Sequence, residues 1–425
     1  MGKKINFIVL ALIVIFCGFT ASNYQELSSQ IDKGDTAWML VASAFVLLMT
    51  PGLSFFYGGM INKKNVISTM LQSFVALGVI SVLWVLVGFS LAFGDSIGGI
   101  IGNPLTYFNF KNVGVEPNPE FSSSIPFLLY ALFQLKFAII TPALITGSFA
   151  GRIRFRSYIL FMVLFSLLIY SPLAHMTWHP DGLFRNWGVL DFAGGTVVHM
   201  SAGFAALAGA IYLGKRKVTE EIHANVPYVI LGTGLLWFGW FGFNAGSALG
   251  ANGDAVIAFA NTNVASATAM IAWLFYERLM GRKMSAIGAC IGAVVGLVAI
   301  TPAAGFVNIG QSMVIGFVAS IISNWMINLK NKSGIDDTLD VFPSHGIGGV
   351  VGMLLTAVFA IDVGLAYGET TTFYYHIIAL FITAAFTFCG SYVLFKIVDL
   401  LLKMRVRDDQ EERGLDISQH GEQIE

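Results

Sequence analysis

The stretch Asp191-Phe-Ala-Gly-Gly-Thr-Val-Val-His199 opens a long apolar segment and places two ionisable side chains near its start. Asp191 would lie at the N-terminus of a helix, and His199 would lie two turns deeper, inside a membrane span. Ionisable groups at membrane depth are costly, so they usually face a cavity and have a function. A second histidine, His345, follows Asp340-Val-Phe-Pro-Ser in another apolar segment. We expect the two histidines to line one pore.

The composition is that of an integral membrane protein. Of the 425 residues, 56% are hydrophobic and only 12% are charged, whereas about 25% of a soluble domain is charged. A net charge of -1 leaves no basic surface for nucleic acid. The three cysteines lie in apolar runs without metal-ligand spacing, and no nucleophile–base pair is present. We therefore expect no metal, no cofactor and no enzymatic activity.

Eleven apolar runs are long enough to cross about 30 Å of hydrocarbon, which takes about 20 helical residues. Their predicted limits are 36–61, 66–94, 124–150, 156–174, 192–214, 226–249, 254–279, 284–303, 309–329, 340–362 and 372–402. Residues 1–22 have two lysines, an apolar run and then small residues, which is the layout of a signal peptide. An uncleaved first helix is the alternative. We predict a transmembrane domain over 35–403 and a cytoplasmic tail over 404–425.

Lysine and arginine residues cluster in alternate loops, after the odd-numbered spans. The clusters lie at 63–64, 152–156, 215–217, 278–283, 330–332 and 403–407. By the positive-inside rule these loops are cytoplasmic. This predicts a multi-pass plasma (inner) membrane protein with its mature N-terminus outside and its C-terminus inside. The fifth and tenth spans then run in opposite directions, and each opens on an aspartate and carries a histidine. That parity predicts an all-α fold with a 5+5 inverted repeat and a site near mid-membrane.

Aromatic side chains supply further candidates. Rings at a pore mouth attract cations, and stacked rings inside a pore block hydrated ions. An interfacial aromatic belt or plain core packing is the alternative reading. The candidates are Phe133 and Phe137, one helical turn apart; Trp240 and Phe243, followed by Ser247; and Trp178 at the outer end of the fourth span.

Three polar features allow more than one interpretation. Asp191 could cap its helix through the N–H groups of Phe192 to Gly194, or it could favour positive charge in the pathway. His175 and His179 have metal-ligand spacing, but Pro180 ends the helix and we do not expect a metal there. Lys136 lies about half-way into its span, so it must snorkel, pair with a carboxylate or face a wet interior.

Together these motifs resemble the ammonium transporter family (Amt/MEP, related to the Rh proteins), and the Amt type within it. The resemblance runs from about Asp35 to the end of the tail. It rests on Pro51-Gly-Leu-Ser-Phe-Phe-Tyr-Gly-Gly59, on the stretches that end at His199 and His345, on Trp240-Phe-Gly-Phe-Asn-Ala-Gly-Ser247 and on Arg413-Gly-Leu-Asp in the tail.

The resemblance implies an eleven-span homotrimer with one narrow pore in each protomer. His199 and His345 match the twin histidines of the pore, and Phe137 and Phe243 match the stacked pair that closes its outer end. The outer vestibule that recruits ammonium, or methylammonium as an analogue, is matched by Trp178, Ser247, Phe133, Asp191 and Trp240. A PII-type signalling protein at the cytoplasmic face is the partner that the resemblance implies.

Ammonium would then bind through cation–π contacts and the Ser247 hydroxyl, lose a proton and cross as ammonia, with or without that proton. Two alternatives are an ammonium sensor, whose tail signals to a partner, and an Rh-like neutral gas channel. The tail is short and carries no output domain, which favours transport over sensing. Trp178 and Ser247 argue against a neutral gas channel, which has little use for a cation-recruiting mouth.

Overall fold

The computed structural model describes residues 2–18, 31–217 and 223–424. Within these ranges, ten helical segments are long and apolar enough to cross a membrane: Lys33–Met60, Lys63–Phe93, Phe127–Ser148, Phe155–Asn186, Gly195–Leu213, Val226–Ala248, Gly253–Leu279, Ile309–Ser333, Phe342–Phe359 and Thr371–Leu401. The chain is therefore the multi-pass, all-α membrane protein that the sequence predicts.

The predicted span 284–303 is the exception in length. Its helix, α13 (Ala286–Ile300), has 15 residues and is about 22 Å long at 1.5 Å per residue. The helix stops before Pro302, which lacks the N–H needed to continue it, and residues 301–306 form turns instead. Ten of the eleven predicted spans are thus long helices, and the remaining one, α13, is a shorter apolar helix.

Several spans are built from more than one helix. The first half of the bundle contains α2 (Lys33–Met60), α3 (Val66–Phe74), α4 (Ala76–Leu83), α5 (Phe89–Phe93), α6 (Phe127–Ile145), α7 (Phe155–Phe165), α8 (Ser171–Trp178), α9 (Leu183–Asn186) and α10 (Ser201–Leu213). The second half contains α11 (Val226–Ala245), α12 (Gly253–Leu279), α13, α14 (Ile309–Ser333), α15 (Gly348–Phe359) and α16 (Thr371–Leu401). A short antiparallel hairpin lies in the longest loop, and each of its strands, β1 (Ser96–Ile97) and β2 (Ile101–Gly102), has two residues.

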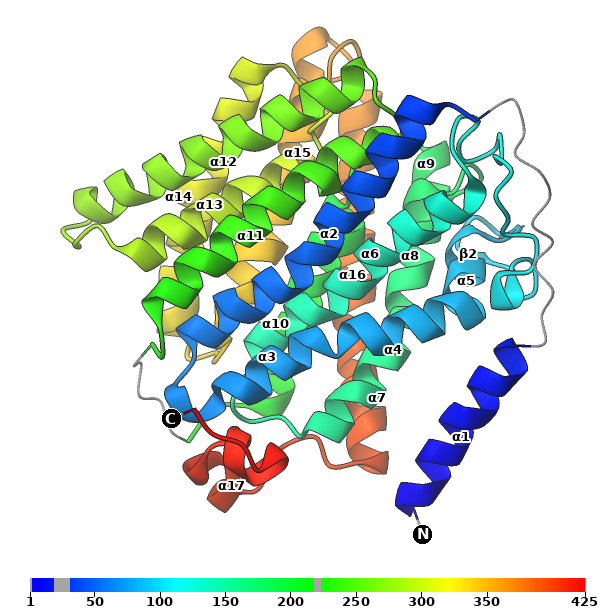
Figure 1. The fold of residues 1–425 in the computed structure, drawn as a ribbon. Coiled ribbons are helices and arrows are strands. Elements are labelled where there is room, and N and C mark those ends of the chain that lie inside the picture. The colour runs from blue at the N-terminus through cyan, green and yellow to red at the C-terminus, as the bar shows by residue number, and fades with distance from the viewer. Residues whose placement is uncertain (1, 19–30, 218–222, 425) are drawn as a thin grey trace.

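Helix α1 (Gly2–Cys17) stands apart from this bundle (Figure 1). Apolar side chains along it, such as Ile8 and Leu12, are more than half exposed. The predicted signal peptide, residues 1–22, extends into a part of the chain that lies outside the described residues. Its cleavage stays a prediction.

Glycines let the helices approach closely where the two halves meet. A side chain at Gly203 of α10 would collide with the backbone of Gly346, and one at Gly349 of α15 would press on the Cβ of His199. Small residues at such crossings permit tight helix packing in membranes. The fifth and tenth spans therefore cross at the positions that follow their histidines.

These two spans begin in the same unusual way. A π-helical segment, Gly195–Met200, precedes α10, and another, Phe342–Ile347, precedes α15. Single turns of π-helix inside α-helices are frequent at functional sites. Arg216 lies just after the end of the fifth span, and it pairs with Asp336, which lies just before the start of the tenth. The tenth span therefore starts at the end of the bundle where the fifth span stops. The two spans run in opposite directions, as the inverted repeat requires.

The tail folds back onto one end of the bundle, where α17 (Asp408–Arg413) lies below α3 and α7 (Figure 1). The backbones of Arg405 and Ile153 form an isolated antiparallel β-bridge, and the N–H of Arg154 donates to the carbonyl of Met404 at 2.8 Å. We call this tail end of the bundle the inner end, and the opposite end the outer end.

Candidate functional site: a histidine pair beneath an aromatic vestibule

The two histidines of the sequence motifs meet in the middle of the bundle. The Nδ1 atoms of His199 and His345 are 3.3 Å apart, and the ring centroids are 5.5 Å apart. The side chains are buried, with 1% and 4% of their surface exposed. Two imidazoles at this distance share one hydrogen bond, so one ring donates and the other accepts.

Thr301, which the sequence analysis did not single out, determines which of the two imidazoles donates the hydrogen bond and which accepts it. The Oγ1 atom of Thr301 donates to the carbonyl of Leu297 at 2.8 Å and accepts from Nε1 of Trp240 at 2.9 Å. It then has one lone pair left for the Nε2–H group of His199, which is 3.3 Å away. This network assigns the proton of His199 to Nε2 and leaves Nδ1 bare. Nδ1 of His345 must therefore donate to Nδ1 of His199.

Two phenyl rings cover the histidine pair on its outer side. The rings of Phe137 and Phe243 are 4.2 Å apart, and Phe243 lies 6.0 Å from the ring of His199. Phe137 also packs edge-on against Phe133 at 5.0 Å and against Trp178 at 5.7 Å. An apolar stack in this position separates the histidines from the outer mouth.

A vestibule of about 460 Å³ opens above the stack. Of the predicted vestibule residues, Trp178, Asp191 and Ser247 line it, together with Phe137 of the stack. Two predicted members lie elsewhere. Phe133 is buried behind Phe137. Trp240 lies deeper, where its indole stacks on the imidazole of His199 with centroids 5.4 Å apart.

Gln134 is a vestibule residue that the sequence analysis did not single out. Its side chain is only 8% exposed, it lines the vestibule, and its Oε1 atom has no hydrogen-bond partner among the described residues. A buried acceptor without a partner is costly unless a ligand or water supplies a donor. Its position directly after Phe133 in the aromatic run was the available signal.

Asp191 acts as a cap at the start of the fifth span, on the predicted N–H of Gly194 and on two residues beyond it. One carboxylate oxygen accepts from the N–H groups of Gly194 at 2.7 Å and Gly195 at 2.6 Å, and the other accepts from the N–H and hydroxyl groups of Thr196. The N–H of Phe192 donates instead to the carbonyl of Pro302. The carbonyl of Asp191 also accepts from Nε1 of Trp178 at 3.1 Å. Asp191 thus positions both the helix and a vestibule wall.

The aspartate that corresponds to Asp191 in the tenth span is Asp337, and the assignment of Asp340 was wrong. Asp340 has a positive φ of 56° and pairs with Lys330. One carboxylate oxygen of Asp337 accepts from the N–H of Phe342, five residues later, at 2.7 Å. Thr196 likewise follows Asp191 by five residues. Each aspartate also precedes its histidine by eight residues, a spacing that was visible in the sequence.

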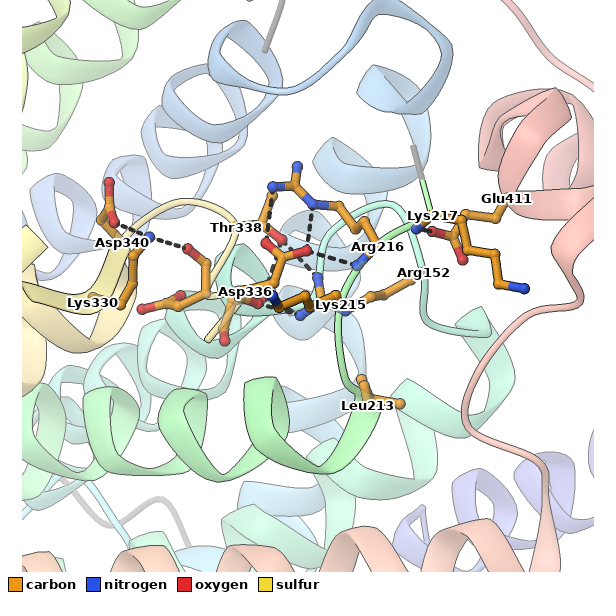
Figure 2. A network of polar contacts seen from close by, with 12 residues as sticks. Arg152, Leu213, Lys215, Arg216, Lys217, Lys330, Asp336, Thr338, Asp340 and Glu411 are labelled. Atoms are coloured by element: carbon orange, nitrogen blue, oxygen red, sulfur yellow. Dashed lines mark hydrogen bonds and ion pairs between the residues drawn. The ribbon is translucent and has the colours of Figure 1, made fainter. Parts of the chain in front are cut away.

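Charged side chains anchor the loop that holds Asp337 at the inner end (Figure 2). Asp336 receives two hydrogen bonds from the guanidinium of Arg216 at 2.9 Å, and its carbonyl accepts from the buried Arg152. Burial alone raises the pKa of the Asp336 carboxyl, but the hydrogen bonds and the charges of Arg216 and Arg152 outweigh burial and hold the pKa below its usual value. Burial lowers the pKa of Arg152 to about 10. The loop is therefore held by charged hydrogen bonds at neutral pH.

The remaining polar candidates have simpler surroundings. The ring of His175 contacts the carbonyl of Ala92 at 3.0 Å and the hydroxyl of Ser96 at 2.8 Å, and His179 accepts from the N–H of Asp181. These two histidines hold the outer loops together. Lys136 is half-buried, and its side chain makes no hydrogen bond or ion pair within the described part of the chain.

The comparisons with known proteins agree with this geometry. The sequence model of the Ammonium Transporter Family matches residues 37–425. The ammonium transporter of Aquifex aeolicus is 47% identical over 97% of this chain and 98% of its own length, and that of Bacillus subtilis is 45% identical over 92% and 98%. The crystal structure of Candida albicans Mep2 superposes with a TM-score of 0.85 at 34% identity, covering 91% of this chain and 89% of that chain. The structure of a sensor Amt protein has a TM-score of 0.84 at 29% identity, over 91% and 98%. This chain therefore belongs to the ammonium transporter family.

Proposed function

We propose that this protein takes up ammonium across the plasma membrane and conducts it through the histidine-lined pore, one pore in each protomer of a homotrimer. Ammonium enters the outer vestibule, where the rings of Trp178 and Phe137 offer cation–π contacts and the Ser247 hydroxyl offers a hydrogen-bond acceptor. The hydroxyl itself donates to the carbonyl of Phe243 at 2.9 Å, which turns its lone pairs toward the vestibule.

The rings of Phe137 and Phe243, which are in contact with a tilt of 36° between them, then act as the selective barrier. A hydrated cation cannot pass two phenyl rings in contact, and a dehydrated one loses its hydration energy without a polar replacement. Ammonium can give up a proton and pass as neutral ammonia, whereas potassium cannot. Selectivity against potassium follows from chemistry rather than from size.

The observation that carries the proposal is the His199–His345 pair below this barrier. Ammonia is a good hydrogen-bond acceptor and a weak donor, and the pair offers both functions inside an otherwise apolar passage. Because the two rings share one hydrogen bond, a proton can also move between them without crossing open apolar space. We assign transport to this pair, as ammonia with or without the proton.

Sensing is the second candidate, and the similarity to a sensor Amt protein favours it. The tail contacts three inner loops, so a partner that bound the tail could read the state of the bundle. We place a PII-type signalling protein at the same inner face, which we take to be cytoplasmic because lysine and arginine gather there.

The test measures currents on solid-supported membranes that carry proteoliposomes of the purified protein, pulsed with ammonium or potassium. Wild type should give an ammonium-specific current, and His199→Ala/His345→Ala should abolish it or admit potassium. His420→Ala, which alters a histidine of the tail outside the pore, is the matched control and should keep the current. An unchanged selective current in the double variant would exclude the histidine pair as the pathway. Methylamine flux without current would indicate a neutral channel, and binding without flux would indicate a sensor.

A further inference from the structure

A basic pocket lies at the inner end, away from the histidine pair. It is a pocket of about 390 Å³ between the start of α7 and the tail. Three of the side chains that line it are arginines, Arg154, Arg156 and Arg407, and none of its lining residues is acidic. Such an accumulation of like charge in one pocket is unfavourable unless an anion occupies it.

The two arginines from the bundle have no partner of their own. Arg156 is exposed, Arg154 is half-buried, and neither side chain makes a hydrogen bond or ion pair within the described residues. The Nε atom of Arg154 is shielded from solvent and has no acceptor. Arg407 is partly neutralised, because Asp409 accepts from its Nε at 2.9 Å and its Nη2 at 3.1 Å. Guanidinium donors without a protein acceptor in one pocket are suited to bind an anion.

The walls of the pocket are well ordered by hydrogen bonds between distant segments. The N–H of Phe155 donates to the Gln419 side chain at 2.8 Å, and Nε2 of Gln419 donates to the carbonyl of Ile153 at 3.1 Å. Tail and bundle are therefore fixed relative to each other at this pocket. A ligand here would contact both.

The position of the pocket suggests the source of the anion. Phe155 is the first residue of a membrane-spanning segment, so Arg154 and Arg156 flank the boundary between hydrocarbon and water. Phosphate groups of lipids lie at this level, and anionic lipids attract juxtamembrane basic residues. The planar guanidinium group also matches phosphate oxygens two at a time.

We propose that Arg154, Arg156 and Arg407 bind a phosphate group, carried by an anionic lipid of the adjacent leaflet or free in solution, and that the bound phosphate fastens the tail to α7.

The test uses the full-length protein in detergent micelles and follows its thermal unfolding by tryptophan fluorescence. Phosphatidylglycerol, phosphatidylcholine and glycerol phosphate are titrated separately. Phosphatidylglycerol should raise the unfolding temperature and phosphatidylcholine should not. If glycerol phosphate acts at the same concentrations, the source is a free phosphate; if only the lipid acts, the source is the membrane.

Variants locate the effect. Arg154→Gln/Arg156→Gln should weaken the apparent affinity about ten-fold or more, since each arginine contributes charge-assisted hydrogen bonds. These side chains have no protein partners, so the variant should fold like wild type without ligand. Arg278→Gln, an exposed arginine outside the pocket, is the control and should bind normally. The proposal would be overturned if wild type and both variants were stabilised equally. It would also be overturned if neither phosphatidylglycerol nor glycerol phosphate stabilised the wild type.

Discussion

The starts of the fifth and tenth spans have the same local design but different charged surroundings. In each half an aspartate caps a π-helical start, and a histidine follows it by eight residues: Asp191 with His199, and Asp337 with His345. Both oxygens of Asp191 accept hydrogen bonds, whereas Oδ1 of Asp337 has no partner among the described residues. The two caps therefore have the same geometry but differ in how many carboxylate oxygens accept hydrogen bonds.

The charges around the two mouths also differ. Two carboxylates, Glu120 and Asp191, and one guanidinium, that of Arg185, line the outer vestibule. A separate pocket of about 500 Å³ at the inner end, distinct from the arginine pocket, is lined by three carboxylates and by three cationic side chains, those of Lys215, Arg216 and Lys330. An excess of negative charge favours a cation, and a balanced set does not. We expect the outer mouth to hold ammonium and the inner mouth to release it.

The largest effect should come from Asp191→Asn, compared with the same substitution at the other capping aspartate, Asp337. Asparagine has only one accepting oxygen. In Asp191→Asn the NH₂ group therefore replaces one carboxylate oxygen, and it must face an N–H group that donates to that oxygen in the wild type. One such loss costs about 1–3 kcal/mol, and we expect methylammonium uptake to fall ten-fold or more and the protein to unfold at lower temperature. In Asp337→Asn the NH₂ group can take the unpartnered Oδ1 position, and uptake should stay within about two-fold of wild type. Equal losses in both variants would remove the distinction between the two caps.

The next effect concerns Thr301, which touches only the outer histidine. Thr301→Val keeps the shape of the side chain but removes the hydrogen bonds to His199 and Trp240. Uptake should fall about five- to ten-fold, mainly through the maximal rate, because two buried donors lose their partner. Thr301→Ser retains the hydroxyl and should restore most of the rate. If valine and serine behave alike, Thr301 does not orient His199.

A smaller change is expected from Glu120, an exposed residue of the vestibule. A unit charge about 8 Å from the substrate in water contributes about 0.5 kcal/mol, so Glu120→Gln should raise the KM for methylammonium about two-fold at low salt. The difference should shrink at high salt. Glu369→Gln, at an exposed outer-end position away from the vestibule, is the control and should leave the KM unchanged.

The smallest effect is a pH dependence at the inner mouth. Because the pKa of Asp336 is lowered in the folded protein, its stabilisation is complete above the ordinary aspartate value of about 3.9 and is lost only as the pH falls through the lower folded value. The difference in unfolding temperature between wild type and Asp336→Asn should therefore be constant from pH 5 to 8 and narrow below about pH 4. A change between pH 5 and 8 would assign the anchoring to another group.

Hydropathy and charge predicted most of the fold, because apolar run length and positive loops are set by the bilayer itself. The two histidines could also be paired from sequence, since parity places their spans in opposite directions. What failed depended on packing. Trp240 lies one helical turn from Phe243, and only the helix rotation decides that its ring faces His199 rather than the vestibule. Asp340 is adjacent to the helix start, but the turn of its backbone gives the cap to Asp337.

Thr301 and Gln134 were missed for a related reason. A threonine before a proline and a glutamine in an apolar helix are ordinary residues in a sequence. They gain importance from partners 61 to 102 positions away, as with Thr301, or from the lack of one, as with Gln134. The distant partners of Thr301 leave no local pattern, and the one signal for Gln134 was its position directly after Phe133 in the aromatic run.

The docked tail has a consequence for how the protein is made. It contacts Asn65 after the first span, Arg154 after the third, and Leu213 and Lys217 after the fifth. All of these loops are synthesised long before the tail, which leaves the ribosome after every span has been made. During that interval the backbone groups that later pair with the tail are uncovered. The inner face is therefore complete only after translation has passed the last span. A chain interrupted earlier would be inserted in the membrane with its inner loops uncovered, and quality control would recognise it by these loops.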